Sequence, residues 1–297
     1  MIESYETYKE IVNEHILDYI PSIDAKSNVL YESMKYSLSS GGKRLRSVLL
    51  LSACEFAGGK YQDALPYACA MEYIHTYSLI HDDLPAMDND DLRRGVPTNH
   101  KVYGDGMAVL AGDGLLNTAY EIMNKDLFLH FDNIKELKKR INAAHCICKG
   151  AGVTGMIAGQ ASDIENERKQ CSNEMLDYIH LNKTGALIVA AVRAGLYLGG
   201  ASDEMMSDMT SYAENLGLAF QIADDILDVK GTEEEMGKRA GADKEHEKVT
   251  YVSVNGLEAS ETRLDELTKA SIKAVEKYYD NAEFFYKLVL KLQNRNH

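Results

Sequence analysis

The placement of proline constrains the fold of this chain most strongly. The 297-residue sequence contains only four prolines, and none of them follows Pro97. Because proline interrupts helices, the long stretch after Pro97 can form extended helical segments. Apolar residues recur at helical spacing in 29–38, in 175–198 and in 257–279. We therefore predict an all-α fold in which one helical-bundle domain covers residues 1–297.

Glycine and charge mark the expected breaks between helices. Ser39–Gly42 should end the second helix, and Gly58–Gly59 should end the third. Residues 229–250 are dense in charge and glycine, so we expect a mobile loop there. This segment is longer than an ordinary connection, and long loops in compact domains are often functional.

The overall charge argues against a nucleic-acid partner. Lysine and arginine total 32 and aspartate and glutamate total 46, which gives a net charge of −14, whereas nucleic-acid-binding domains are normally basic. Residues 1–10 carry no apolar run, and Arg193 interrupts the most apolar stretch, so we expect neither a secretion signal nor a membrane span. Five cysteines without a CxxC pair fit a reducing compartment. We expect a cytoplasmic protein.

An aspartate-rich motif occurs twice. The first reads Asp-Asp-Leu-Pro-Ala-Met-Asp over 82–88, and the second reads Asp-Asp-Ile-Leu-Asp over 224–228. At about 100° per helical residue, the second motif's carboxylates share a face with Gln221 among apolar neighbours. Buried carboxylates are costly unless arginine or a hard cation compensates them. Oxygen ligands suit Mg²⁺, which commonly serves a phosphate or diphosphate when a few carboxylates hold it. A solvated acidic face is the alternative, and it fits 88–91 better than 224–228.

Two basic clusters could hold the anion that such a metal site serves. Gly41–Arg46 reads GGKRLR at an expected helix start, where backbone N–H groups and the helix dipole favour anions. Arg93–Arg94 follows the first acidic motif. Either cluster alone would more often be a solvated surface. His75 lies seven residues before Asp82, about 20° away on the same helix face, whereas His81 should point elsewhere.

Together these segments resemble the trans-isoprenyl diphosphate synthases, and most closely the eubacterial farnesyl diphosphate synthases. The resemblance extends over nearly the whole chain, and a pair of such aspartate motifs with GGKRLR is a specific signature. The matching segments are GGKRLR (41–46), HDDLPAMDNDDLRRG (81–95), GQASD (159–163), HLNKTGALI (180–188), FQIADDILD (220–228) and Gly237–Lys238. The resemblance implies a helical bundle around a deep central cavity, with the two acidic motifs facing each other across its mouth.

The resemblance also implies the reaction, a prenyl transfer in a homodimeric enzyme. About three Mg²⁺ ions would bridge the carboxylates to the diphosphate of an allylic substrate, which ionises and is attacked by isopentenyl diphosphate. The departing diphosphate would take up the proton, and 229–250 would act as a lid that excludes water.

Specific positions match the roles known in the family. The implied metal ligands are Asp82, Asp88 and Asp224, with Asp83 and Asp228 in support. The implied groups for the allylic diphosphate are Arg93, Lys183, Thr184, Gln221 and Lys238. The implied groups for isopentenyl diphosphate are Lys43, Arg46, His75 and Arg94.

Product length depends on residues just before the first motif. In the family, the positions of Tyr77 and Ser78 form part of the cavity floor, and a bulky Tyr77 implies a C15 rather than a C20 product. On a helix, however, Ser78 lies about 40° and Tyr77 about 140° from the direction of Asp82. Tyr77 packing against a neighbouring helix is therefore an alternative, and C20 stays open.

One departure and four rivals complete the sequence-based interpretation. The family's late Gly-Lys-x-Thr-Tyr pattern has glutamate for glycine here, at Glu247. A geranylgeranyl diphosphate synthase is the nearest alternative. A terpene cyclase would not need a second diphosphate site, and a phosphohydrolase built on His81–Asp82 would need more histidines near the metal. A catalytically inactive regulatory subunit would be expected to lose one aspartate motif, and both are intact.

Overall fold

Helices dominate the structure, in agreement with the all-α prediction. The computed structural model describes residues 3–21, 28–167, 169, 171–230, 249–278 and 281–293. Its helices in chain order are α1 (Glu3–His15), α2 (Asn28–Ser39), α3 (Leu45–Phe56), α4 (Tyr61–Asp82), α5 (Asn99–Tyr103), α6 (Asp105–Leu129), α7 (Ile134–Ala151), α8 (Met156–Asn166), α9 (Asn173–His180), the π-helical turn η2 (Leu181–Gly185), α10 (Ala186–Gly199), α11 (Asp203–Lys230), α14 (Tyr251–Asn255), α15 (Leu257–Val275), the 3₁₀ turn η3 (Glu276–Tyr278) and α16 (Glu283–Gln293).

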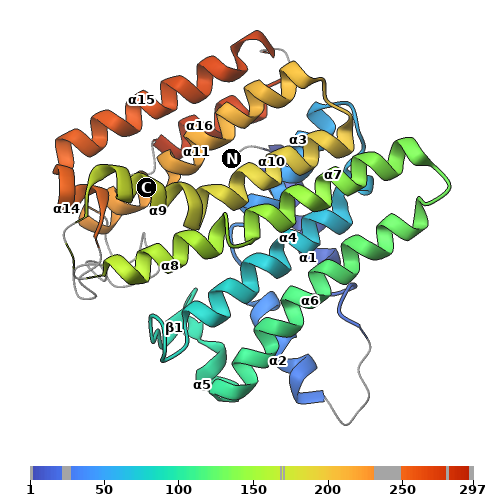
Figure 1. The fold of residues 1–297 in the computed structure, drawn as a ribbon, viewed down its shortest axis with the longest axis horizontal. Helices are drawn as coiled ribbons and strands as arrows, with labels where there is room; N and C mark the ends of the chain where they lie inside the picture. The colour runs from blue at the N-terminus through green and yellow to red at the C-terminus, as the bar shows by residue number, and fades with distance from the viewer. Residues whose placement is uncertain are drawn as a thin grey trace.

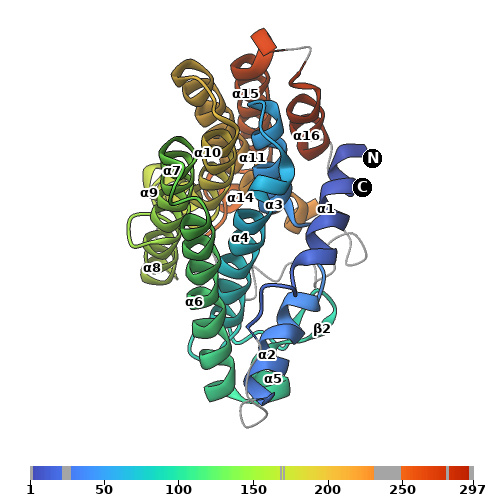
Figure 2. The same cartoon turned by 90° about the vertical axis from the view of Figure 1, so that its right-hand side faces the viewer.

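The helices pack in layers around a central group (Figures 1 and 2). Helices α4, α10 and α11 lie in the middle, with α6, α7 and α8 on one side and α1 and α16 on the other. Helix α10 contacts α3, α7 and α11, and α4 contacts α6. Their packed faces make one continuous hydrophobic cluster, which stabilises the bundle by removing apolar surface from water. No helix within the described ranges is long and apolar enough to cross a membrane.

Most of the expected helix boundaries are confirmed. Helix α2 ends at Ser39, α3 ends at Phe56, and α15 covers most of the apolar stripe expected in 257–279. Local capping supports several starts: the side chains of Asn133 and Ser172 accept backbone N–H groups at the beginnings of α7 and α9. The loop expected at 229–250 begins later than predicted, because α11 continues to Lys230. Residues 231–248 lie outside the described residues.

A short β-hairpin, which the sequence pattern did not predict, follows the first acidic motif. Strand β1 (Leu92–Arg93) pairs antiparallel with β2 (Val96–Pro97). Arg94 and Gly95 form the two-residue turn, with φ values of 55° and 80°. Two successive positive φ values suit a tight hairpin turn, but arginine is not a usual residue there, so the sequence carried only a weak signal.

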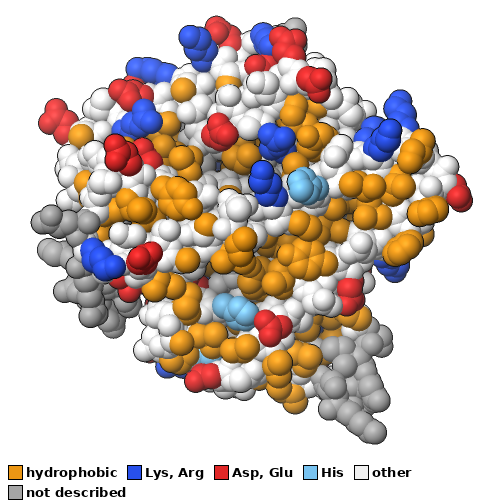
Figure 3. Space-filling view, in the orientation of Figure 1, with side chains coloured by type: hydrophobic (Ala, Val, Ile, Leu, Met, Phe, Trp, Pro, Cys, Tyr) orange, Lys and Arg blue, Asp and Glu red, His pale blue; other side chains and the backbone are white. Residues whose placement is uncertain are grey.

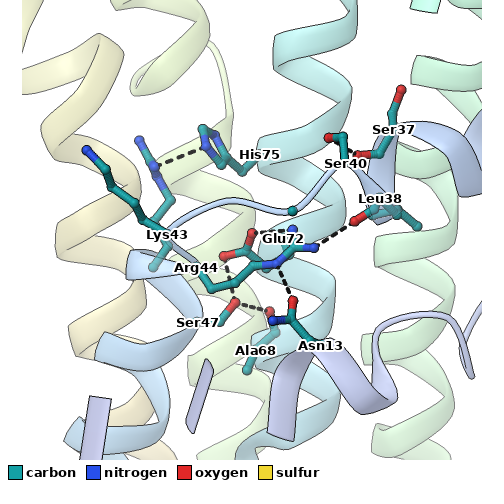
Figure 4. A network of polar contacts seen from close by, with 12 residues as sticks. Asn13, Ser37, Leu38, Ser40, Lys43, Arg44, Ser47, Ala68, Glu72 and His75 are labelled. Atoms are coloured by element: carbon teal, nitrogen blue, oxygen red, sulfur yellow. Dashed lines mark hydrogen bonds and ion pairs between the residues drawn. The ribbon is translucent and has the colours of Figure 1, made fainter. Parts of the chain in front are cut away.

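A buried ion pair holds the loop between α2 and α3 (Figure 4). Arg44 caps α3 in a left-handed conformation and points inward, where its Nη1 lies 3.3 Å from Oε2 of Glu72 on α4. Its Nε donates to Oδ1 of Asn13 at 3.0 Å, and its Nη2 donates to the carbonyl of Leu38 at 2.6 Å. Ser47 donates to the other oxygen of Glu72 at 2.8 Å. One arginine therefore ties α1, α2 and α4 together behind the GGKRLR loop.

Breaking this pair should unfold the bundle more easily. Arg44→Met should lower the free energy of unfolding by about 3–5 kcal/mol, because the charge of Glu72 is left buried without a partner. Adding Glu72→Leu should recover much of that loss, since no lone charge then remains inside. Urea unfolding followed by circular dichroism gives the free energy of unfolding of Arg44→Met, of Glu72→Leu and of the double variant. If the double variant loses as much free energy of unfolding as the two single variants together, the two residues are not coupled.

Candidate active site

The two acidic motifs lie at the same end of the bundle. The first motif begins where α4 ends, and the second lies near the end of α11. Both helices run toward the left edge of Figure 1. The charge of Asp224 on α11 acts on Arg46, which in turn contacts His75 on α4. The predicted meeting of acidic and basic groups from distant segments is therefore present.

The first motif begins at the last residue of α4. After Asp82, the chain makes a tight turn in which Leu84 is buried, and the backbone N–H of Asp88 returns to donate to the carbonyl of Asp82 at 2.8 Å. The four residues between Asp83 and Asp88 thus bring Asp88 back beside Asp82. Gln160 on α8 donates its Nε2 to Oδ1 of Asp82 at 2.5 Å, which orients that carboxylate.

Asp83 plays a different part from its neighbour. Its side chain is buried, and its Oδ1 accepts Nε of Arg93 at 2.7 Å and also Nη2 of the same guanidinium. Burial raises the pKa of Asp83 to about 6, and the hydrogen bonds and charge of Arg93 oppose that rise. Arg93 also reaches Asp90 at 3.2 Å. Asp83 therefore anchors the hairpin that carries the arginines.

The second motif divides its roles in the same way. Asp225 is buried, and its two oxygens accept Nε2 of Gln221 at 3.1 Å and the backbone N–H of Tyr251 at 2.7 Å. Thr184 on η2 donates to Oε1 of Gln221 at 2.9 Å. Asp228 is also buried, whereas Asp224 is only half-buried. Asp224 is therefore the carboxylate of this motif best placed to meet a ligand.

Lys183 sits in the π-helical turn η2, an irregularity that is frequent at functional sites. Gly159 on α8 makes this placement possible, because a Cβ there would lie 2.0 Å from the backbone nitrogen of Lys183. Nζ of Lys183 donates to Oδ2 of Asp163 at 2.6 Å. Gln160 and Asp163 belong to the GQASD segment, but no role was predicted for either residue. Their i, i+3 spacing puts both on one face of α8, and this spacing is the signal that could have identified them as partners of the site.

The basic side of the site converges on His75. Nη1 of Arg46 lies 3.3 Å from Nε2 of His75 (Figure 4). Burial lowers the pKa of His75 well below its ordinary value, and the charges of Arg46, Arg94, Arg93 and Arg44 lower it further. His75 is therefore neutral near pH 7 and can accept a hydrogen bond from Arg46. Lys43, in the GGKRLR loop, is exposed (Figure 4).

Residues earlier on α4 point in several directions. His81 turns toward α6, with Nε2 3.1 Å from the carbonyl of Val109, so the expectation that it points away from the motif is confirmed. Tyr77 is buried and packs edge-on against His81 of the same helix at 5.7 Å between ring centres, a contact that tests neither the cavity-floor role nor packing against a neighbouring helix. Ser78 donates to the carbonyl of His75 at 2.9 Å. Lys238 lies outside the described residues.

The donor set fits Mg²⁺ held partly by a ligand. All the aspartates are hard oxygen donors, as Mg²⁺ requires. Within the described part of the chain, no three His, Cys, Asp or Glu side chains stand close enough to form a metal site by themselves. Mg²⁺ in proteins is usually bound by one or two carboxylates, and phosphate oxygens complete its coordination. Asp82, Asp88 and Asp224 are the residues that would hold it.

Comparisons with known proteins agree with this geometry. The family described as Polyprenyl synthetase matches residues 27–286. The chain is 44% identical over 275 residues to a farnesyl diphosphate synthase of Geobacillus stearothermophilus, covering 93% of this chain and 90% of the relative. It is 46% identical over 275 residues to a geranylgeranyl diphosphate synthase of Cyanophora paradoxa, covering 92% and 89%. A solved geranyltransferase structure from Legionella pneumophila superposes with a TM-score of 0.84 at 30% identity, covering 99% of this chain and 96% of that one. The chain therefore belongs to the polyprenyl synthetase family.

Proposed function

We propose that this protein is a short-chain trans-prenyltransferase that condenses isopentenyl diphosphate with dimethylallyl and geranyl diphosphate to give farnesyl diphosphate. One observation carries the proposal. Arg46 contacts neutral His75, and the charges of the hairpin arginines also act on that histidine. The two acidic walls, which are the aspartate-rich segments 82–88 and 224–228, lie beside this basic group, and Asp224 acts on Arg46. That arrangement offers one place for a metal-bound diphosphate and another for a diphosphate held by cations. Two diphosphates are what a condensation needs and a hydrolysis does not.

The allylic diphosphate would bind between the acidic walls. Asp82, Asp88 and Asp224 would share Mg²⁺ with it, and the family is generally Mg²⁺-dependent. Bound Mg²⁺ supplies Lewis-acid stabilisation of the leaving diphosphate. Lys183 and Arg93 add fixed positive charge, each already oriented by a carboxylate, Asp163 or Asp83. Thr184 and Gln221 hold each other beside η2 and offer further hydrogen bonds.

Isopentenyl diphosphate would bind on the basic side. Lys43, Arg46 and Arg94 would neutralise its charge, and His75 would orient Arg46 by accepting its hydrogen bond. The C–O bond of the allylic substrate breaks first, which gives an allylic cation and diphosphate. The double bond of the fixed isopentenyl diphosphate then attacks the cation and forms the new C–C bond. The proton lost from the new C–C product passes to the departed diphosphate. Lys238 remains a proposed contact of the allylic diphosphate.

Two rivals lose support on specific contacts. A phosphohydrolase built on His81 and Asp82 would need both side chains to face one metal, but His81 is engaged with α6. An inactive subunit would have no use for the preserved orientation of Asp82 by Gln160 or of Lys183 by Asp163. A C20 product remains the alternative, because relatives named for both products match this chain equally well.

Product analysis tests the proposed function and its chain length together. Purified protein is incubated with Mg²⁺, labelled isopentenyl diphosphate and dimethylallyl diphosphate, and the dephosphorylated alcohols are separated. We expect a dominant C15 alcohol, with diphosphate release only when both substrates are present. Tyr77→Ala should shift the product toward C20, since it removes bulk at the proposed cavity floor. No condensation with any allylic primer would overturn the function, and a C20 product from the unmodified protein would overturn the farnesyl assignment and the role of Tyr77.

We also propose that two copies pair through the face formed by α6 and α7. Figure 3 shows hydrophobic side chains gathered across the face that α6, α7 and α8 present in Figure 1. An exposed apolar patch of this kind usually marks an interaction surface. Its most exposed members on α6, α7 and their connection are Val109, Leu110, Phe128, Leu129, Phe131, Ile134 and Ile141.

The free cysteines fit a reducing compartment. We propose that the protein is cytoplasmic, and fractionation of host cells would test this location.

Sedimentation equilibrium tests the pairing. We expect twice the chain mass of 33.1 kDa for the unmodified protein and the single-chain mass for Phe131→Asp, which places a charge on the apolar face. Val29→Asp, an equally polar change at an exposed position on α2, should leave the mass doubled. A single-chain mass for the unmodified protein would contradict the pairing.

A further inference from the structure

The β-hairpin connects the two halves of the site through adjacent arginines. Arg93 lies in β1 and is held by Asp83 and Asp90 of the acidic side. Arg94 lies in the turn, and its Nη1 donates to the carbonyl of Gly41 in the GGKRLR loop. Arg93 is thus tied by carboxylates to the segment that follows α4. The placement of Arg94 depends instead on how closely the hairpin approaches the end of α2.

Arg94 fits tightly against the backbone of that loop. A Cβ on Gly42 would lie 2.6 Å from Cζ of Arg94 and within 2.8 Å of its terminal nitrogens. Gly42 also has a φ of 130°, a backbone conformation that favours glycine. The guanidinium of Arg94 therefore lies directly against the backbone of the loop, and its place there follows the position of the hairpin.

Asn99, just after the hairpin, sets that spacing. Its side chain is buried, and its amide donates to the carbonyl of Ser33 at 2.9 Å and to Oγ of Ser37 at 2.8 Å. Its Oδ1 accepts the hydroxyl of Ser33 at 2.9 Å. Both serines are on α2, which ends at Ser39, two residues before Gly41. Asn99 thus fastens the hairpin to the helix that leads into the loop.

Hydrogen bonds contribute to this alignment. A cavity of about 30 Å³ lies between α2, α4 and the hairpin, lined by Ser37, Thr76, Asp83, Arg94 and Asn99 among others. The directional hydrogen bonds of Asn99 beside this cavity hold the hairpin in place relative to α2. One further bond, from the hydroxyl of Tyr36 to the carbonyl of Pro97 at 2.7 Å, supports the same seam.

We propose that Asn99 is a positioning residue that holds Arg94 over Gly42 and thereby sets the affinity of the basic side of the site for isopentenyl diphosphate. This inference rests on the proposed function. It assigns to Asn99 no contact with either substrate. The acidic side is affected less, because Arg93 keeps its own anchors at Asp83 and Asp90.

Steady-state kinetics of Asn99→Ala give the first test. KM for isopentenyl diphosphate should rise about tenfold, comparable with the loss of one charge-assisted hydrogen bond. KM for the allylic substrate should stay within about twofold, because Arg93 remains anchored. Should Asn99→Ala fail to fold, Ser33→Ala removes only one of the three bonds and should give a smaller rise in the same constant. Equal increases of both KM values in the folded variant would overturn the proposal.

A double-mutant cycle with Arg94→Ala separates positioning from general loss of stability. Once Arg94 is gone, Asn99→Ala should raise KM for isopentenyl diphosphate no further. Tyr67→Phe is the matched control, because it removes a buried hydrogen bond to Asp126 in a different part of α4. It should lower the melting temperature and leave KM unchanged. Additive effects of the Asn99 and Arg94 changes would overturn the proposal. Absence of condensation by the unmodified protein would instead overturn the proposed function.

Discussion

Repulsion between carboxylates is the physical constraint on which the rest of this structure depends. Two aspartate-rich segments end at one end of a helical bundle, where burial strengthens their mutual repulsion. The fold meets this cost by giving a protein donor to several of them. Arg93 pairs with Asp83, Gln160 orients Asp82, and Gln221 with the backbone of Tyr251 engages Asp225. Asp224 is only half-buried, and we propose that it helps to hold a cation together with a bound diphosphate.

Neighbouring residues within one charged motif consequently differ in burial and in the groups that they contact. In the GGKRLR loop, Lys43 is exposed, Arg44 is buried against Glu72, and Arg46 reaches His75. Adjacent helical residues point about 100° apart, and strand or turn neighbours diverge even more. A run of like charges therefore contains both exposed groups, which we propose bind ligand, and buried groups that support them. Buried supports of this kind can hold the proposed ligand-binding groups in a preorganised arrangement.

The sequence was sufficient to predict the all-α class and the positions of several helices. The scarcity of proline and the 3.6-residue periodicity predicted α2, α15 and the consecutive helical segments α9, η2 and α10, because both signals are local in the sequence. The repeated acidic motif and the basic clusters predicted a shared site for the same reason. What escaped prediction depends on tertiary contacts: the inward turn of Arg44 toward Glu72, the bond from Gln160 to Asp82, and the hairpin turn at Arg94. Each partner lies far away in sequence, so no local spacing identifies it.

We propose that the aspartates of 82–88 and 224–228 form a metal site only together with a diphosphate. Equilibrium dialysis of the protein against Mg²⁺, with and without inorganic pyrophosphate, tests this dependence directly. A protein-free titration corrects for Mg²⁺ bound by pyrophosphate alone. We expect weak Mg²⁺ retention by the protein alone, cooperative retention of Mg²⁺ and pyrophosphate together, and loss of that cooperativity in Asp224→Asn. Tight, saturable Mg²⁺ binding in the absence of pyrophosphate would show a preformed metal site and contradict this proposal.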